Sequence, residues 1–219
     1  MNNPLDFFDA IYCINLKERT DRWNRCHAEF EKFGISDRII KFSAIKPEID
    51  ERWDRPTPWA RPGYPRPGAV GCAESHKAVI ELAKEQNLNN VLVLEDDFMV
   101  CENWSENLES SLNDLVKYDW HIFYLGYHLH RTWGMRRNRG KNLKKINSKK
   151  RRGIHLTVGL AYNSSIFDYL IEDIDPFDWN KQGREGHVDK YFARNSKLKK
   201  YYADPMILEP DWSLGTDVQ

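Results

Sequence analysis

A short apolar run that ends in three carboxylates constrains this chain more than any other feature. Residues 91–94 read VLVL, which is typical of a central strand covered on both faces, and Glu95, Asp96 and Asp97 follow directly. Like charges at this spacing raise one another's pKa, and a divalent cation relieves the repulsion. Carboxylate oxygens suit Mg²⁺ or Mn²⁺. The sequence therefore predicts a metal site of Asp97, Glu95 and Asp96, against the alternative of a solvated acidic turn.

The rest of the pattern predicts an α/β fold over residues 1–219, with a mostly parallel central sheet flanked by helices. An apolar run at 10–16, a helix from Thr20 or Asp21 to Gly34, and a second run at 39–44 are typical of strand, helix and parallel strand. Ser75 is a good N-cap and predicts a helix that begins at His76. Further strands are expected at 121–126, 154–162 and 201–208. Since ligands bind beyond the carboxyl ends of strands in such sheets, the acidic triplet lies at the expected place for a site.

Two segments interrupt this alternation of strands and helices. Residues 47–67 contain six Pro together with Trp53, Trp59 and Tyr64, which predicts a loop whose aromatic side chains cover or stack on a ligand, or only anchor the loop. Residues 131–152 hold eleven basic residues and no acid, which predicts an exposed loop. That loop suits an anionic ligand or an anionic membrane surface, or is simply solvated.

Several signatures are absent from the sequence. It has no GxGxxG motif after the first strand and no GxxxxGK[ST] motif, so a nucleotide diphosphate here would be held by a metal and basic side chains. It has no signal peptide, no apolar stretch near 18 residues and no CxxC pair among four Cys, so we expect reduced cysteines and a cytoplasmic location, with peripheral membrane association only through 131–152. Lys plus Arg equals Asp plus Glu at 33 each, and no nucleic-acid partner is expected.

Three stretches carry a resemblance when they are taken together. They are residues 14–22 (INL followed by Arg19, Asp21 and Arg22), residues 68–76 (GAVGC followed by Ser75 and His76), and residues 93–97 (VLEDD). The combination resembles glycosyltransferase family 25, which includes bacterial lipooligosaccharide galactosyltransferases and collagen hydroxylysine galactosyltransferases. Weaker echoes follow at residues 161–162, 188–189 and 210–217, so the matches run in the family's order from about residue 11 to residue 218. The segments 47–67 and 131–152 are departures from the family core.

The resemblance implies a single GT-A-like domain that performs a metal-dependent, inverting transfer of a hexose. The expected donor is UDP-galactose, and the expected acceptor is a hydroxyl of a glycan of lipooligosaccharide type or of another, anionic acceptor. The residues expected to bind the nucleotide sugar are Asn15, Arg19, Arg22, Ser75, His76, Glu95 and Asp96. A carboxylate base opposite the leaving group fits inversion, with Asp189 as the first candidate and Asp217 as the second.

Two other functions remain open from the sequence. A catalytically inactive protein that binds a nucleotide sugar or carbohydrate would show saturable donor affinity without UDP release. A metal-dependent nucleotidyltransferase would share the acidic cluster but would release pyrophosphate. A Ser-His hydrolase is a poor reading of Ser75 and His76, because adjacent residues do not by themselves set up the nucleophile and its base.

Overall fold

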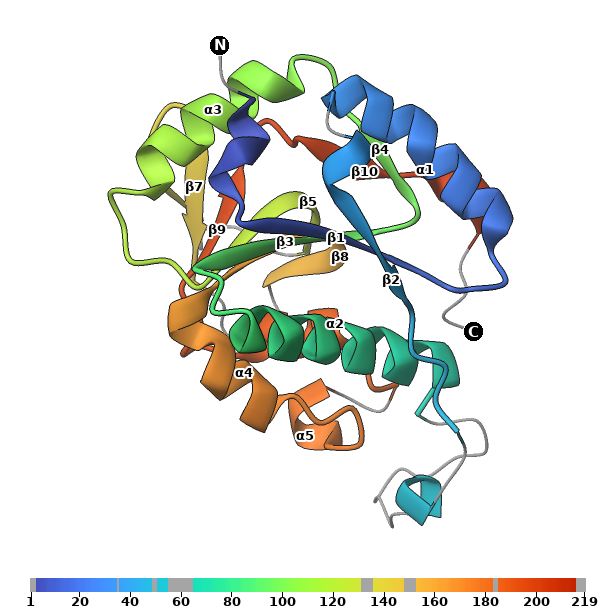
Figure 1. The fold of residues 1–219 in the computed structure, drawn as a ribbon. Coiled ribbons are helices and arrows are strands. Elements are labelled where there is room, and N and C mark those ends of the chain that lie inside the picture. The colour runs from blue at the N-terminus through green and yellow to red at the C-terminus, as the bar shows by residue number, and fades with distance from the viewer. Residues whose placement is uncertain are drawn as a thin grey trace.

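The protein is an eight-stranded sheet between two layers of helices (Figure 1). The computed structural model describes residues 3–34, 36–48, 51–54, 65–130, 136–147, 153–182 and 185–215. The sheet strands are β1 (Ala10–Asn15), β2 (Ile39–Ser43), β3 (Asn90–Glu95), β5 (Ile122–His130), β6 (Arg136–Asn138), β7 (Leu143–Ile146), β8 (Gly153–Asn163) and β9 (Lys200–Ala203), and a separate pair is β4 (Phe98–Val100) with β10 (Leu208–Pro210). The α-helices are α1 (Thr20–Phe33), α2 (Pro67–Glu85), α3 (Trp104–Leu115), α4 (Phe167–Asp173), α5 (Trp179–Gln182) and α6 (Val188–Arg194).

The strand order is β2-β1-β3-β8-β5-β9-β7-β6. Strands β1, β2, β3, β5, β6 and β9 run in one direction, and β7 and β8 run in the other. The predicted α/β fold with a mostly parallel sheet is therefore confirmed, with β8 inserted antiparallel between β3 and β5. Because β1 and β3 are parallel neighbours, with Ile14 opposite Glu95, both strands end at the same edge of the sheet.

Each face of the sheet has its own apolar core. On one face, α1 contributes Cys26, Phe30 and Phe33, at the spacing of a single helix face, and α3 contributes Leu108 and Leu112. The opposite face is covered by α2, α4 and α6, which bury residues such as Val79, Leu170 and Phe192 (Figure 1). Gly34 ends α1 in the left-handed conformation, as its position predicts. Within the described residues, no helix has the length and hydropathy needed to cross a bilayer.

Two expectations about local structure are wrong. Helix α2 begins at Pro67 and not at His76, so Ser75 lies inside the helix. Proline suits the first helical turn because the missing N–H has no helical partner there. The basic segment is not only a loop, since β6 and β7 form a hairpin on the sheet through a pairing of β7 with β9. Leu143 and Ile146 are buried there, and the half-buried lysines between them have partners on or beside β9, since Lys144 pairs with Asp204 and Lys145 lies over the Tyr201 ring.

Lys200 gives a first testable prediction. Its side chain is fully buried, and Nζ donates to the carbonyls of Phe192 (2.5 Å) and Asn195 (2.7 Å) at the end of α6. Burial lowers the pKa of Lys200 to about 7, whereas an unfolded lysine titrates near a pKa of about 10.4. Between these values the unfolded chain binds a proton that the folded protein does not, so the free energy of unfolding rises with pH.

We expect Lys200→Met to remove this rise. The free energy of unfolding of the wild type, minus that of the variant, should grow by about 2 kcal/mol between pH 7 and pH 9. Urea unfolding at the two pH values measures both free energies. A difference that is the same at pH 7 and pH 9 would show that Lys200 keeps its ordinary pKa in the folded protein.

Candidate active site

The acidic triplet lies at the edge of the sheet where β1 and β3 end. Glu95 is the last residue of β3, and Asp96 and Asp97 form the turn into β4. The strand alternation that would place Glu95 and Asp97 on one side and Asp96 on the other therefore stops at Glu95. Instead, Arg22 Nη1 lies 2.8 Å from Asp96 Oδ1 and 3.9 Å from Asp97 Oδ2. The turn directs both aspartates toward the same arginine.

Asp96 anchors the triplet to α1 and β1. Its Oδ1 accepts a hydrogen bond from Arg22, and its Oδ2 accepts one of 2.6 Å from Asn15 Nδ2. Arg22 also donates to the carbonyls of Leu214 and Gly215, so it ties the C-terminal segment to the same turn. Asp96, Asn15 and Arg22 are all buried. Both oxygens of Asp96 are occupied, which suits a residue that orients the turn better than one that binds a metal or a nucleotide.

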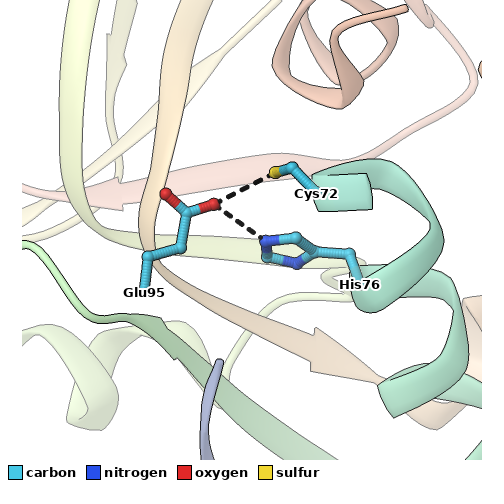
Figure 2. A group of neighbouring side chains, drawn as sticks. All are labelled: Cys72, His76 and Glu95. Carbon is cyan, nitrogen blue, oxygen red and sulfur yellow. Dashed lines mark hydrogen bonds and ion pairs between the residues drawn. The ribbon is translucent and has the colours of Figure 1, made fainter. Parts of the chain in front are cut away.

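Glu95 faces the other way, toward α2 and β8 (Figure 2). Its Oε1 accepts from Thr157 Oγ1 at 2.5 Å, from His76 Nε2 at 3.2 Å and from Cys72 Sγ at 3.3 Å. His76 Nδ1 in turn lies 2.9 Å from Tyr162 Oη. Three donors therefore fix one carboxylate oxygen, and Oε2 points away from Cys72 and His76. Cys72, His76 and Glu95 offer metal-ligand atoms within 4.8 Å of one another, and hydrogen bonds join them here.

The three carboxylates differ in their electrostatics. Burial raises the pKa of Glu95, but hydrogen bonds from His76, Thr157 and Cys72 outweigh it and leave the pKa below its usual value. Burial raises the pKa of Asp96 despite its bonds to Arg22 and Asn15. Burial and then the charges of Glu95 and Asp96 raise the pKa of Asp97 to about 7. The mutual repulsion predicted from the sequence thus falls mainly on Asp97, whose buried Oδ1 has no partner among the described residues.

The GAVGCAESH segment serves two purposes along one helix. Gly71 and Ser75 hold the chain near Ile45, because a Cβ at Gly71 would lie 2.4 Å from the Ile45 carbonyl oxygen and Ser75 Oγ accepts from the Ile45 N–H at 2.8 Å. Cys72 and His76, one turn apart, reach Glu95. Ser75 is fully buried, so these contacts support a structural role for it, while its predicted nucleotide contact stays a prediction. His76 is also fully buried, and its Nε2 is hydrogen-bonded to Glu95 Oε1.

Asp189 lies near this cluster at the start of α6. Its Oδ2 is 3.4 Å from His155 Nδ1 and accepts from the Leu156 N–H at 3.4 Å. The Asp189 charge is among the causes that raise the pKa of the Cys72 thiol, after burial and Glu95. Since Cys72 bonds to Glu95, the predicted base and the acidic triplet lie in one region, brought together by α2, β3, β8 and α6.

The remaining candidates have different outcomes. Arg19 precedes α1 and pairs with Asp21 at 2.9 Å, and its predicted nucleotide contact stays a prediction. Asp217, Trp59 and Tyr64 lie outside the described residues. Trp53 packs edge-on against Phe177 at 5.3 Å and donates to the Glu48 carbonyl, which supports the anchoring reading of this side chain.

Sequence reasoning missed Thr157 and Tyr162 in the network around Glu95, and it offered His155 for the metal or nucleotide site without its contact to Asp189. All three residues belong to β8, and nothing in the local pattern shows which strand lies beside β3. A signal did exist for Cys72, because it stands four residues before His76 and therefore shares its helix face. Because the helix was expected to begin at His76 and not at Pro67, Cys72 was placed outside it and the shared face was not recognised.

Comparison with known proteins assigns the chain to a family. The family model described as glycosyltransferase family 25 (LPS biosynthesis protein) matches residues 8–153. The chain belongs to glycosyltransferase family 25. The matched residues include β1, α1, α2, β3 and the acidic triplet, so the family's sequence pattern covers most of the site described above.

Relatives within family 25 differ in their activity. Procollagen galactosyltransferase 1-B of Xenopus laevis is 31% identical over 129 residues, covering 54% of this chain and 21% of the relative. Inactive glycosyltransferase 25 family member 3 of Homo sapiens is 30% identical over 136 residues, covering 54% and 22%. Procollagen galactosyltransferase 2 of Mus musculus is 24% identical over 237 residues, covering 95% and 36%. The chain therefore spans about a fifth to a third of the length of these relatives.

A solved structure confirms the GT-A-like fold of this family 25 chain. A glycosyltransferase involved in the glycosylation of the major capsid of PBCV-1 superposes with a TM-score of 0.52 at 11% identity. The superposition covers 95% of this chain and 93% of the other. At this identity the likeness concerns the fold alone.

The Glu95 network gives a second testable prediction. Tyr162→Phe would leave the buried His76 Nδ1 without a partner, so we expect a loss of about 1–3 kcal/mol in the free energy of unfolding. Tyr124→Phe is the matched control, because the buried Tyr124 hydroxyl has no partner among the described residues and its removal should cost little. Urea unfolding of both variants measures the contrast. Equal losses would mean that the Tyr162–His76 bond does not stabilise the network.

Proposed function

We propose that this chain is a metal-dependent, inverting glycosyltransferase that moves a hexose, galactose from UDP-galactose, to a hydroxyl of a glycan of lipooligosaccharide type or of another acceptor. The observation that carries the proposal is the state of Asp97 at the sheet edge. This carboxylate has a raised pKa and a buried Oδ1 without a partner among the described residues. Family membership supports the same activity.

The donor set fits a hard divalent cation, Mn²⁺ or Mg²⁺. Asp97 would hold the ion together with Oε2 of Glu95, because Oε1 of Glu95 and both oxygens of Asp96 are already hydrogen-bonded. Oxygen ligands of this kind suit these metals. A cation bound there would neutralise the negative charge that develops on the leaving diphosphate.

The chain's own residues have separate tasks in this proposal. Arg22 and Asn15 hold Asp96, and so fix the turn that presents Asp97. Cys72, His76 and Thr157 keep Glu95 ionised and oriented toward the nucleotide sugar. These groups are positioned before substrate arrives, which reduces the reorganisation that the reaction needs.

Asp189 is proposed as the group that takes the proton of the acceptor hydroxyl. Its Oδ2 is held by His155 and the Leu156 N–H, while its buried Oδ1 has no partner among the described residues. That leaves one oxygen to accept from a substrate hydroxyl. Asp217 remains the second candidate for the base.

The test is the release of nucleoside diphosphate from a panel of nucleotide sugars, with and without Mn²⁺. We expect metal-dependent UDP release from one donor, UDP-galactose. Metal-dependent UDP binding without release would favour an inactive binding protein, a reading supported by the human relative that is named inactive. Release of pyrophosphate from a nucleoside triphosphate and a sugar phosphate would instead identify a nucleotidyltransferase. If the protein neither binds UDP in a metal-dependent way nor releases it from any donor, the proposal is wrong.

A further inference from the structure

Three buried polar atoms near the start of β8 and α6 have no partner among the described residues. They are Nε2 of His155, Oδ1 of Asp189 and the hydroxyl of Tyr124. Asp189 and Tyr124 are near one another, since the Asp189 charge, after burial, raises the pKa of Tyr124. A buried polar atom without a partner costs about 1–3 kcal/mol, so such atoms are normally matched by water or by a ligand.

The backbone of β8 is shaped to join His155 to Asp189. Leu156 has φ +74°, a conformation that costs a non-glycine residue on the order of 1–3 kcal/mol and that is concentrated at functional sites. In this conformation the Leu156 N–H donates to Asp189 Oδ2, and His155 Nδ1 lies 3.4 Å from the same oxygen. Two groups therefore hold Oδ2, and the strain is located where they meet.

The arrangement leaves two acceptor atoms, Asp189 Oδ1 and His155 Nε2, without a partner among the described residues. A carboxylate beside Nδ1 favours the imidazole tautomer that carries its proton on Nδ1, and Nε2 is then an acceptor. Other titratable groups near the pair are His130 on β5, whose ring centroid is 6.0 Å from that of His155, and His187 before α6. Tyr124 and Cys72 are also near, since the Asp189 charge contributes to raising the pKa of each. Burial raises the pKa of Asp189, but the hydrogen bonds from His155 and from the Leu156 N–H outweigh it and leave the pKa below its usual value, so the carboxylate stays ionised beside a neutral His155.

We propose that Asp189 Oδ1 and His155 Nε2 accept hydrogen bonds from two neighbouring hydroxyls of the acceptor, which makes the acceptor a sugar diol and not an isolated hydroxyl. The inference rests on the proposed transferase function. The oxygen of one hydroxyl forms the new bond to the donor sugar, its proton passes to Asp189 Oδ1, and the bond to the diphosphate breaks with its electron pair on the diphosphate. The second hydroxyl donates to His155, which is a positioning residue and sets acceptor specificity.

The test compares acceptors that differ by one hydroxyl. Methyl galactoside and methyl glucoside serve as diol probes, their mono-deoxy analogues lack one hydroxyl, and a hydroxylysine peptide presents an isolated hydroxyl. The wild type should prefer an intact glycoside over the analogue that lacks the hydroxyl next to the reacting one by about 10–100-fold in kcat/KM. In His155→Phe this ratio should fall to about threefold or less. His128→Phe is the matched control, since His128 is the exposed cross-strand neighbour of His155, and it should keep the wild-type ratio.

Three results would overturn the proposal: equal use of intact and deoxy glycosides by the wild type, retained discrimination in His155→Phe, or a preference for the hydroxylysine peptide. Restored discrimination in His155→Gln would support it, because the glutamine amide retains a hydrogen-bonding group. A separate readout distinguishes failure here from failure of the proposed function. If the wild type releases no UDP from any donor, the transferase proposal fails. The ¹⁵N NMR signal of His155 then still reports whether methyl glycosides perturb Nε2, and an unperturbed signal would overturn the acceptor site itself.

Discussion

Replacing Asp97 with Asn is expected to reduce metal-stimulated UDP release by about 100–1000-fold, which is the scale of losing one charged group that stabilises a transition state. Asp97 is the one carboxylate of the triplet that combines a raised pKa with a buried oxygen lacking a described partner. Asparagine keeps its shape but offers a neutral oxygen, so a divalent cation loses its main charged ligand. Titration of UDP release against Mn²⁺ concentration measures both the rate and the metal affinity.

The same substitution should stabilise the protein in the absence of metal. An unfolded aspartate ionises near a pKa of about 3.9, whereas Asp97 in the folded protein does so near 7. The folded state therefore binds more protons between these values, and the free energy of unfolding falls as pH rises through this window. At pH 8 the asparagine variant avoids this penalty, so we expect a gain of about 1–3 kcal/mol in the free energy of unfolding.

Asp119→Asn is the matched control for both measurements, because Asp119 is an exposed carboxylate that pairs with Lys199. It should leave UDP release and the free energy of unfolding nearly unchanged. Loss of activity together with loss of stability in Asp97→Asn would point to misfolding. Activity within about tenfold of the wild type would exclude Asp97 as the principal metal ligand.

Replacing Asp189 with Asn should remove sugar transfer and spare nucleotide binding. General-base catalysis contributes about 10²–10⁴-fold, so kcat for transfer should fall by that factor while the Kd for UDP changes by less than about threefold. The physical reason is the geometry of the side chain: Oδ2 is held by His155 and the Leu156 N–H, and an amide cannot take a proton on the free side. Product formation and UDP calorimetry measure the two quantities.

Asp168→Asn is the matched control for this second experiment. Asp168 is an exposed carboxylate on α4 that contacts Lys84, so its loss should not alter transfer. Transfer at more than about a tenth of the wild-type rate in Asp189→Asn would contradict the assignment. The base would then be sought at Asp217.

The sequence by itself determined the parts of this protein that depend on local pattern. The apolar run before Glu95 predicts a buried strand. The carboxylates follow this run in the sequence, so they lie at the carboxyl end of the strand, where a site is expected. The start and end of α1 follow from its apolar spacing and from Gly34, whose left-handed conformation suits a residue without a side chain. The motifs around Arg22, His76 and the triplet were sufficient to identify the family.

The tertiary structure alone decided which groups complete the site. Strand β8 enters the sheet antiparallel between β3 and β5. This placement brings Thr157 to Glu95 and Tyr162 to His76, and it brings the His155 side chain and the Leu156 N–H to Asp189. The basic segment likewise becomes a hairpin because β9 offers an edge with which β7 can pair. Contacts between residues far apart in the chain determine which strands pair and in which direction, and a local pattern of apolar and polar residues does not predict those contacts.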